Sequence, residues 1–371
     1  MNKKLMAVAV AGALAAPAVA FAQASSVQIY GRANLGFDSA EAKGGKTATG
    51  ATSDHKRRNR VFDSSSRLGF QGTENLGMGL KAVFKIETGV NMDNGSNTGQ
   101  NGGVNGATGY LASREGWAGL AGNWGELTFG KQNVWWTNFT DQTQANYINV
   151  GLQYATGGNG AGLAAPAIRV TNDVKYTSPM FSGFKFWLNY SPTSEAATGG
   201  ADTDGSIGGV SAAYLGRQFI GEFHWAQNEA AGPSPATITG TKLGLGWKYQ
   251  PGAILSLILI RLEDENVGAI DRKVNSWQLN WSQMMGNWQW IAQLGASGDA
   301  TGTSNTGSKG WLVAAKYHLS KRTGVYASYT KVTNEEDATY DYRGGGMGVG
   351  ITGTNKGADP SIFALGIQHN F

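Results

Sequence analysis

Hydrophobic and polar residues alternate through most of the chain beyond residue 22. In residues 27–37 (VQIYGRANLGF) one side carries Val27, Ile29, Ala33, Leu35 and Phe37, and the other carries Gln28, Tyr30, Arg32 and Asn34. Side chains of a β-strand point alternately to opposite faces, so a period of two predicts a strand with one apolar and one polar face.

The same alternation returns in pairs of segments joined by short turns. In residues 66–90, a turn at 75–79 (NLGMG) separates two such segments. The further predicted pairs are 111–121 with 125–131, 171–178 with 184–191, 206–215 with 218–227, 241–249 with 253–263, 272–284 with 287–297, and 309–318 with 323–333. With the first segment and the last one, 361–371, they make sixteen strands.

Longer polar segments, such as 91–109, 192–205 and 334–360, separate the pairs. Short turns that alternate with long loops are typical of outer-membrane barrels. The predicted fold class is therefore all-β: a 16-stranded antiparallel transmembrane β-barrel with short periplasmic turns and long extracellular loops. A soluble β-sandwich is the alternative, but the outer faces of its sheets would be polar.

Aromatic residues near the strand ends favour the barrel, because amphipathic rings collect at the two membrane interfaces. By parity, twelve are predicted on the apolar side: Trp117, Phe129, Tyr190, Trp225, Trp247, Tyr249, Trp277, Trp281, Trp288, Trp290, Trp311 and Tyr317. The chain has 56 Gly, 8 Pro and 39 aromatic residues (12 Trp, 13 Tyr and 14 Phe), a composition that suits strands and turns rather than disorder.

The last predicted strand ends on an aromatic residue of its apolar face. Phe363, Leu365, Ile367 and Phe371 share that face with His369. We expect this strand to pair with residues 27–37 and close the ring, because an unpaired strand edge in lipid leaves backbone groups without hydrogen bonds.

Two segments and one residue depart from the simple pattern. Residues 253–260 are apolar on both faces, which predicts that their inner face contacts protein rather than water. Residues 38–60 form a polar segment rich in Gly, Lys and Arg that follows the first strand. Glu115 has the parity of the apolar face beside Arg114. A place at a rim or at a subunit contact would suit this carboxylate, but its position is unexplained.

Residues 1–22 have the pattern of a secretory signal peptide. Lys3 and Lys4 precede an apolar stretch over 5–19, and Ala20-Phe21-Ala22 is a small-x-small cleavage site, although a cut after Ala24 also fits. The predicted barrel domain is then 23–371. Without the two lysines, the net charge of +4 becomes +2, too small to indicate nucleic-acid binding. The chain has no cysteine, which excludes disulfides and thiolate metal sites.

Basic residues recur on the predicted polar face. Arg32, Arg67 and Arg114 have lumen-facing parity on three different strands, and Lys85 has it on a fourth. Like charges 4 Å apart repel by about 4 kcal/mol at an effective dielectric constant of 20. Such a row is tolerable where water fills the space or carboxylates neutralise it, and a water-filled lumen satisfies the first condition.

Five motifs spread along the chain resemble the general porins of β-proteobacteria. They are VQIYGRANLGF (27–37), SRLGFQGTENLGMGLKAVFKIE (66–87), REGWAGLAGNWGELTFGKQ (114–132), NDVKYTSPMFSGF (172–184) and FALGIQHNF (363–371). The resemblance implies a trimeric barrel in the outer membrane, a third loop folded into the lumen, and passive solute diffusion. It also implies a constriction where a basic wall faces acidic residues of that loop. Arg32, Arg67 and Arg114 match this wall, and Lys85 is a reasonable fourth member.

The third loop corresponds to residues 132–170, whose only acidic residue is Asp141. We expect Asp141 to form the negative side of the constriction, although a simple turn-forming role is equally compatible with the residue. One acid against three or four bases predicts a pore that prefers anions. The resemblance further implies that the terminal aromatic strand, with Phe363, Leu365, Ile367 and Phe371, is read by the barrel-assembly machinery.

The sequence therefore predicts a general diffusion porin without a cofactor or a catalytic step. Expected partners are two further copies of the chain, outer-membrane lipid and lipopolysaccharide, the barrel-assembly machinery, and small anionic and neutral solutes. One alternative is a channel selective for phosphate or organic acids. A lipid-acting barrel enzyme is another, for which His318 near Ser320 or Ser328 is the candidate pair. The four histidines show no metal-binding spacing.

Overall fold

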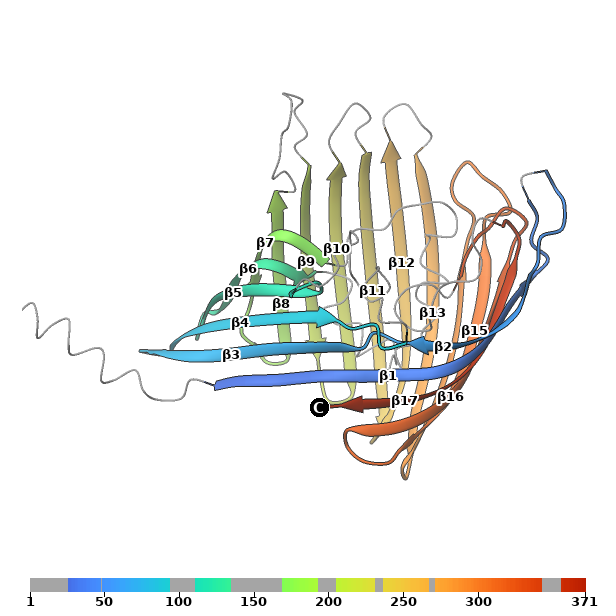
Figure 1. Ribbon diagram of the computed structural model, residues 1–371. Coiled ribbons are helices and arrows are strands. Elements are labelled where there is room, and N and C mark those ends of the chain that lie inside the picture. The colour runs from blue at the N-terminus through green and yellow to red at the C-terminus, as the bar shows by residue number, and fades with distance from the viewer. Residues whose placement is uncertain are drawn as a thin grey trace, which may run out of the picture.

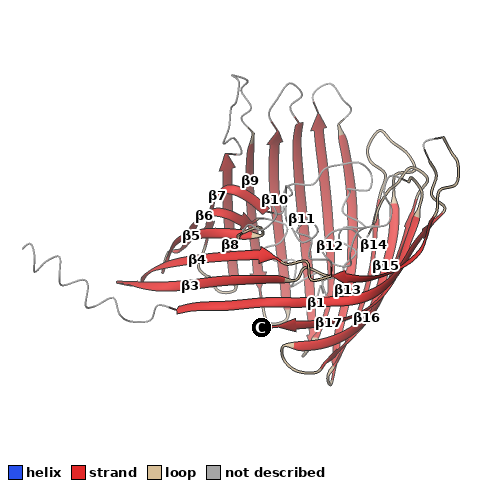
Figure 2. Cartoon of the chain, viewed as in Figure 1, coloured by secondary structure: helices blue, strands red, loops and turns tan. Residues whose placement is uncertain are grey.

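The computed structural model describes residues 26–47, 49–93, 111–134, 169–192, 205–230, 236–266, 271–341 and 355–371. Strands dominate these ranges (Figure 2), and none of the residues in them forms a helix long and apolar enough to cross a bilayer. The strands are β1 (Ser26–Lys43), β2 (His55–Asp63), β3 (Arg67–Gly77), β4 (Leu80–Gly89), β5 (Glu115–Gly122), β6 (Gly125–Asn133), β7 (Arg169–Thr177), β8 (Phe184–Pro192), β9 (Ser206–Leu215), β10 (Phe219–Ala230), β11 (Ala236–Gln250), β12 (Ala253–Asn266), β13 (Arg272–Met285), β14 (Trp288–Ser297), β15 (Ser308–His318), β16 (Thr323–Asn334) and β17 (Asp359–Asn370).

All seventeen strands belong to one antiparallel sheet that closes on itself, because β1 pairs with β17 as well as with β2 and β3. In Figure 1 the strands of the near wall cross those of the far wall, as expected when the strands of a barrel are tilted against its axis. Each chain neighbour from β3 onward is also a sheet neighbour, which makes the fold a simple meander.

The closed barrel has sixteen strands because β2 and β3 together make one of them. Both pair with β1, β3 with Ser26–Arg32 and β2 with Leu35–Ala42. The break between them is held by polar contacts to Asn34, whose backbone N–H donates to the Ser66 hydroxyl at 2.9 Å and whose carbonyl accepts from the Ser64 N–H at 2.8 Å. The predicted number of barrel strands is confirmed.

About half of the polar segment 38–60 is strand rather than loop. β1 continues to Lys43, and β2 returns from His55 to Asp63. Inside this hairpin Arg60 Nε and Asp38 Oδ1 form an ion pair at 2.9 Å, with the Asp38 side chain fully buried. Because Arg60 neutralises the buried Asp38, this charged part of the chain can extend the sheet.

The predicted seam between the first and last strands is confirmed, with its register shifted. β17 pairs with β1 from Arg32↔Asn370 to Lys43↔Asp359 rather than with residues 27–37 as a whole. Gly31 and Phe371 exchange backbone hydrogen bonds at 2.9 and 3.1 Å beyond that ladder. The start of β1, from Ser26, pairs with β3 alone because the strands of a barrel are staggered.

The two faces of the wall follow the predicted alternation. On β1, Val27, Ile29 and Phe37 are 68%, 61% and 47% exposed, whereas Asn34 is buried. Phe363, Leu365, Ile367 and Phe371 are also exposed on the outer face. The outside is thus apolar, as a lipid-facing belt requires.

Two residues at β5 were predicted on the wrong face. In the β4–β5 register Lys85 lies opposite Trp117, and Glu87 lies opposite Glu115. Directly opposite residues share a face of the sheet, so Trp117 and Glu115 face inward with Lys85 and Glu87. The alternation breaks between Arg114 and Glu115, because both of these neighbouring side chains join the inner network, so a count that starts from Arg114 does not carry into β5.

The inner face of β12 is apolar and covered by protein, as predicted. Ile258 and Leu262 are at most 1% exposed and belong to one buried cluster with Leu312, Ile362 and Tyr340. Tyr340 comes from the segment after β16, which Asn334 fixes by accepting from the Tyr340 N–H at 3.1 Å and donating to its carbonyl at 2.8 Å. This segment therefore packs against the inner wall.

Candidate functional site

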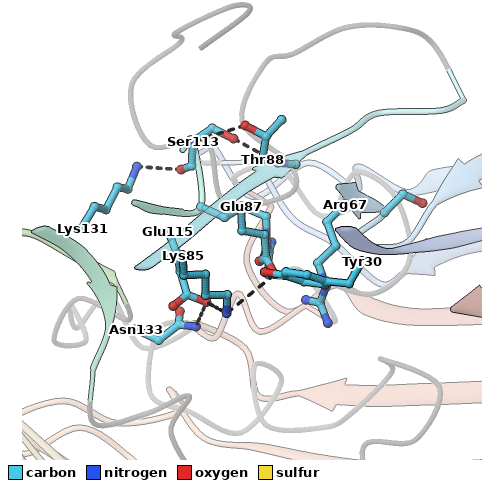
Figure 3. A network of polar contacts seen from close by, with 12 residues as sticks. Tyr30, Arg67, Lys85, Glu87, Thr88, Ser113, Glu115, Lys131 and Asn133 are labelled. Carbon is cyan, nitrogen blue, oxygen red and sulfur yellow. Dashed lines mark hydrogen bonds and ion pairs between the residues drawn. The ribbon is translucent and has the colours of Figure 1, made fainter. Parts of the chain in front are cut away.

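Glu87 is the centre of a polar network on the inner wall (Figure 3). Its carboxylate is 4% exposed and accepts from Arg114 Nε at 2.6 Å and from the Tyr30 hydroxyl at 3.0 Å. Arg67 Nε lies 3.7 Å and Lys85 Nζ 3.9 Å from the same carboxylate. One buried carboxylate on β4 thus gathers three cations from β3, β4 and the residue before β5.

Glu115 is a second carboxylate in this network, and it is also buried. It accepts from Lys85 Nζ at 2.7 Å, from Asn133 Nδ2 at 2.7 Å and from Trp117 Nε1 at 3.2 Å. Figure 3 shows Lys85 between the two carboxylates, next to the Tyr30 ring. Lys85 is therefore held by two carboxylates at once.

The basic wall continues beyond these two carboxylates. Arg32 lies opposite Arg67 in the β1–β3 register, and its Nε donates to Asn370 Oδ1 at 3.3 Å. On β15, the inward-facing Lys316 donates to Gln368 Oε1 at 2.5 Å across β16. We call the five cations Lys316, Arg32, Arg67, Lys85 and Arg114 the basic wall.

The structure brings together three predicted site residues, Arg67, Lys85 and Arg114, and places Arg32 beside them. Asp141 lies outside the described residues. The ends of the predicted third loop are strand, because β6 runs to Asn133 and β7 begins at Arg169.

Sequence reasoning missed both carboxylates and Lys316 as members of the site. The signal for Glu87 was present, since it lies two residues after Lys85 on the same face. Lys316 could also have been found, because it alternates with the outward-facing Tyr317 on its strand. Glu115 was hidden by the break in alternation before β5.

The geometry fits charge selection rather than catalysis. Carboxylates that accept hydrogen bonds from guanidinium and ammonium groups fix the cations in place while only partly neutralising them. Three cations of the basic wall, Arg67, Lys85 and Arg114, face two carboxylates, Glu87 and Glu115. The described residues hold no group of three His, Asp or Glu that could bind a metal ion.

The candidate pair of the enzyme alternative is not formed, because the partner of His318 Nε2 is Gln289 Oε1 at 3.2 Å. A triad-like group does occur at Ser211, His224 and Glu222 on β9 and β10. The Ser211 hydroxyl lies 2.9 Å from His224 Nδ1, but Glu222 Oε2 is 3.9 Å from Nε2. All three are at most 2% exposed, so no lipid or solute can reach the hydroxyl. The group is a packed part of the wall.

Residues 7–337 match the family described as Gram-negative porin. The chain belongs to this family. The porin is 30% identical to outer membrane porin protein 32 of Delftia acidovorans, over all of both chains. It is 28% identical to an outer membrane porin of Bordetella pertussis, over 95% of this chain and 99% of that one.

Solved structures show the same fold. The anion-selective porin from Comamonas acidovorans superimposes with a TM-score of 0.73 at 23% identity, over 94% of this porin and 100% of that chain. A trimer form of OmpT from Vibrio cholerae gives a TM-score of 0.67 at 14% identity, over 94% and 100%. This porin is a multi-pass β-barrel of the outer membrane and a general diffusion channel. Family and fold point to a channel rather than an enzyme.

Proposed function

We propose that this porin prefers anions to cations, with Arg32, Arg67, Lys85 and Arg114 as the basic side of its constriction. The observation that carries the proposal is the convergence of Arg67, Lys85 and Arg114 on Glu87. Arg32 lies opposite Arg67 on the neighbouring strand β1. Rings of fixed charge select ions of the opposite sign in a narrow pore. Asp141 is proposed from the sequence alone as the opposing negative group.

A planar bilayer that separates two KCl concentrations tests the preference. A pore that prefers anions gives a reversal potential with the same sign as the chloride equilibrium potential. Replacing Arg32, Arg67 and Arg114 by Gln should move that potential toward zero. The matched control replaces the arginines Arg57, Arg217 and Arg322, which lie outside the basic wall, and should leave it unchanged. A cation-selective wild type would refute the proposal, and an unchanged triple variant would remove these arginines from the constriction.

A channel selective for phosphate or organic acids is the second candidate, because the fixed cations offer a binding site for an oxyanion. The same bilayer measurement distinguishes a selective channel from a general diffusion channel. Conductance that saturates with one anion, and chloride current that this anion blocks, would favour the selective channel. Conductance proportional to concentration favours general diffusion.

The assembly and maturation of the porin are also proposals. We infer a homotrimer, supported by the likeness to a structure in trimer form, and native mass spectrometry should give three chains. Residues 1–22 are inferred to be a signal peptide, and the N-terminus of the mature protein should follow Ala22 or Ala24. Phe363, Leu365, Ile367 and Phe371 are proposed as the assembly signal, supported by their exposure on one face of β17.

A further inference from the structure

Tyr30 places an aromatic ring inside the basic wall. The ring lies over the neighbouring strand β3, where a Cβ atom at Gly69 would be only 2.3 Å from Tyr30 Cζ. Gly69 is opposite Tyr30 in the β1–β3 register and is buried beneath the ring. The Tyr30 side chain is itself partly exposed. One face of the ring therefore rests on the wall, and the other is turned to the lumen.

Two contacts hold the ring in this position. The Tyr30 hydroxyl donates to Glu87 Oε2 at 3.0 Å, and Lys85 Nζ lies 5.8 Å from the centroid of the ring. Because a carboxylate already accepts from the hydroxyl, Tyr30 offers solutes the face of its ring rather than a hydrogen-bond donor. A ring that is fixed in advance also loses little freedom when a second ring stacks on it.

Cations border the ring on two sides. Arg32 and Arg67 form the next inward-facing pair along β1 and β3, and Lys85 on β4 lies toward the other side. Figure 3 shows the Tyr30 ring beside the Arg67 and Lys85 side chains. Residues of one face are about 6.8 Å apart along a strand, a distance comparable with a benzene ring that bears a carboxylate. Such a solute can place its ring over Tyr30 and its carboxylate at a guanidinium group.

A second tyrosine of the inner wall shows what distinguishes this ring. Tyr326 lies over Gly366 in the same way, since a Cβ atom at Gly366 would be 2.3 Å from Tyr326 Cζ. However, Tyr326 is only 4% exposed, and its hydroxyl donates to Asn34 Oδ1 at 2.9 Å. Tyr326 is therefore part of the packed wall, whereas the partly exposed Tyr30 is within reach of solutes.

We propose that Tyr30, with Arg32, Arg67 and Lys85 around it, forms a binding subsite for planar aromatic carboxylates. The inference rests on the anion preference proposed above and names the class of solute that this part of the wall holds most strongly. A guanidinium fork binds a carboxylate by paired hydrogen bonds, and the face of Tyr30 stacks against an aromatic ring in an offset arrangement. Phosphate and aliphatic acids make the first contact but not the second.

Planar-bilayer recording of the full-length porin with benzoate and cyclohexanecarboxylate tests the proposal. The two acids have the same charge and nearly the same size, but only benzoate is planar and aromatic. Each acid is added to a pore that carries a chloride current, and the concentration that halves this current is measured. Benzoate should halve the current at a concentration about three to ten times lower than cyclohexanecarboxylate, the factor expected for one aromatic pair.

Variants of Tyr30 identify the cause of this ratio. Y30L should reduce it to about one, because leucine removes the ring but leaves the three cations. Y30F loses only the hydroxyl and should keep most of the ratio. The matched control is Y326L, the same substitution at the buried ring, which should keep the wild-type ratio. A heat-modifiability gel shows whether each variant is folded before it is recorded.

The outcomes separate this inference from the proposed function. Equal half-blocking concentrations of the two acids in an anion-preferring wild type would overturn the subsite and leave the proposed function intact. A wild-type ratio in Y30L would also overturn the subsite, because the ring would then not be its cause. A reversal potential that favours cations in a KCl gradient would refute the proposed function and the subsite with it.

Discussion

At the scale of single residues, Glu87 carries two roles. Its carboxylate holds Arg114 and Tyr30 by direct hydrogen bonds and attracts Arg67 and Lys85. It also lowers the positive charge of the wall by one. The Glu87 carboxylate therefore stabilises the wall but reduces its preference for anions.

Replacing Glu87 by Gln should separate these roles. The neutral amide keeps the shape but loses the charge, so the reversal potential in a KCl gradient should shift further toward the chloride potential. The free energy of unfolding should fall by about 1.5–3 kcal/mol, the range for a hydrogen bond to a charged group, because Arg114 keeps a buried charge. E74Q is the matched control, since Glu74 is exposed on the same hairpin. A shift toward cations would contradict the assignment.

At the scale of elements, the seam between β1 and β17 depends on a close approach. Gly31 and Phe371 exchange backbone hydrogen bonds, and a Cβ atom at Gly31 would lie 2.2 Å from Phe371 Cζ and 2.7 Å from the Arg67 carbonyl oxygen. The Phe371 ring can turn away, but the carbonyl belongs to the neighbouring strand. Only glycine fits without a shift.

G31A should therefore loosen the seam by about 1–3 kcal/mol, the usual cost of overpacking. The folded band of the porin in a heat-modifiability gel should convert to the unfolded band at a lower temperature than in the wild type. G221A is the control, because a Cβ atom at Gly221 would meet nothing within 4 Å. If both variants melt together with the wild type, the contact between Gly31 and Phe371 is not limiting for stability.

The turn after β14 gives a pH-dependent element outside the membrane. Asp299 Oδ1 accepts from the N–H groups of Thr306 and Gly307 at 2.6 and 3.0 Å. These hydrogen bonds lower the Asp299 pKa below its ordinary value of 3.8, and the one from the Thr306 backbone N–H has the largest effect. A group with a lowered folded pKa stabilises above its unfolded pKa and loses that effect as pH falls through the folded value.

Amide hydrogen exchange of Thr306 and Gly307 should therefore accelerate below about pH 4, beyond the intrinsic effect of pH on exchange. The N–H of Thr301 donates to the carbonyl of Lys273 and, having no titratable acceptor, serves as the internal reference. Identical behaviour of the three amides between pH 5 and 3 would show that ionised Asp299 does not hold this turn.

Alternation predicted the elements better than it predicted their ends and the site. Strand parity placed Arg32, Arg67 and Lys85 on the inner face because it needs only local sequence. It failed at Glu115 and Trp117, because the alternation breaks between Arg114 and Glu115, which both point inward. The length of β1 was missed because Asp38 becomes compatible with a buried strand only through its ion pair with Arg60. A partner from another strand is not visible in a local pattern.

At the scale of the whole molecule, charge is arranged differently on the two faces of the barrel. The inner face gathers the basic wall around Glu87 and Glu115, whereas the outer face exposes apolar side chains such as Phe363, Leu365 and Ile367. Fixed charge therefore faces the lumen, through which solutes pass.

This separation predicts how selectivity should depend on salt. The basic wall acts through a water-filled lumen, where the Debye length falls from about 10 Å at 0.1 M salt to about 3 Å at 1 M. The ratio of anion to cation permeability, measured at a fixed tenfold KCl gradient, should therefore decline as the mean concentration rises. K309Q with K331Q should follow the wild-type curve, because Lys309 and Lys331 lie on the outer face of β15 and β16. Replacement of Arg32, Arg67 and Arg114 should flatten it. A ratio independent of salt in the wild type would instead indicate ion binding at direct contact, where screening has little effect.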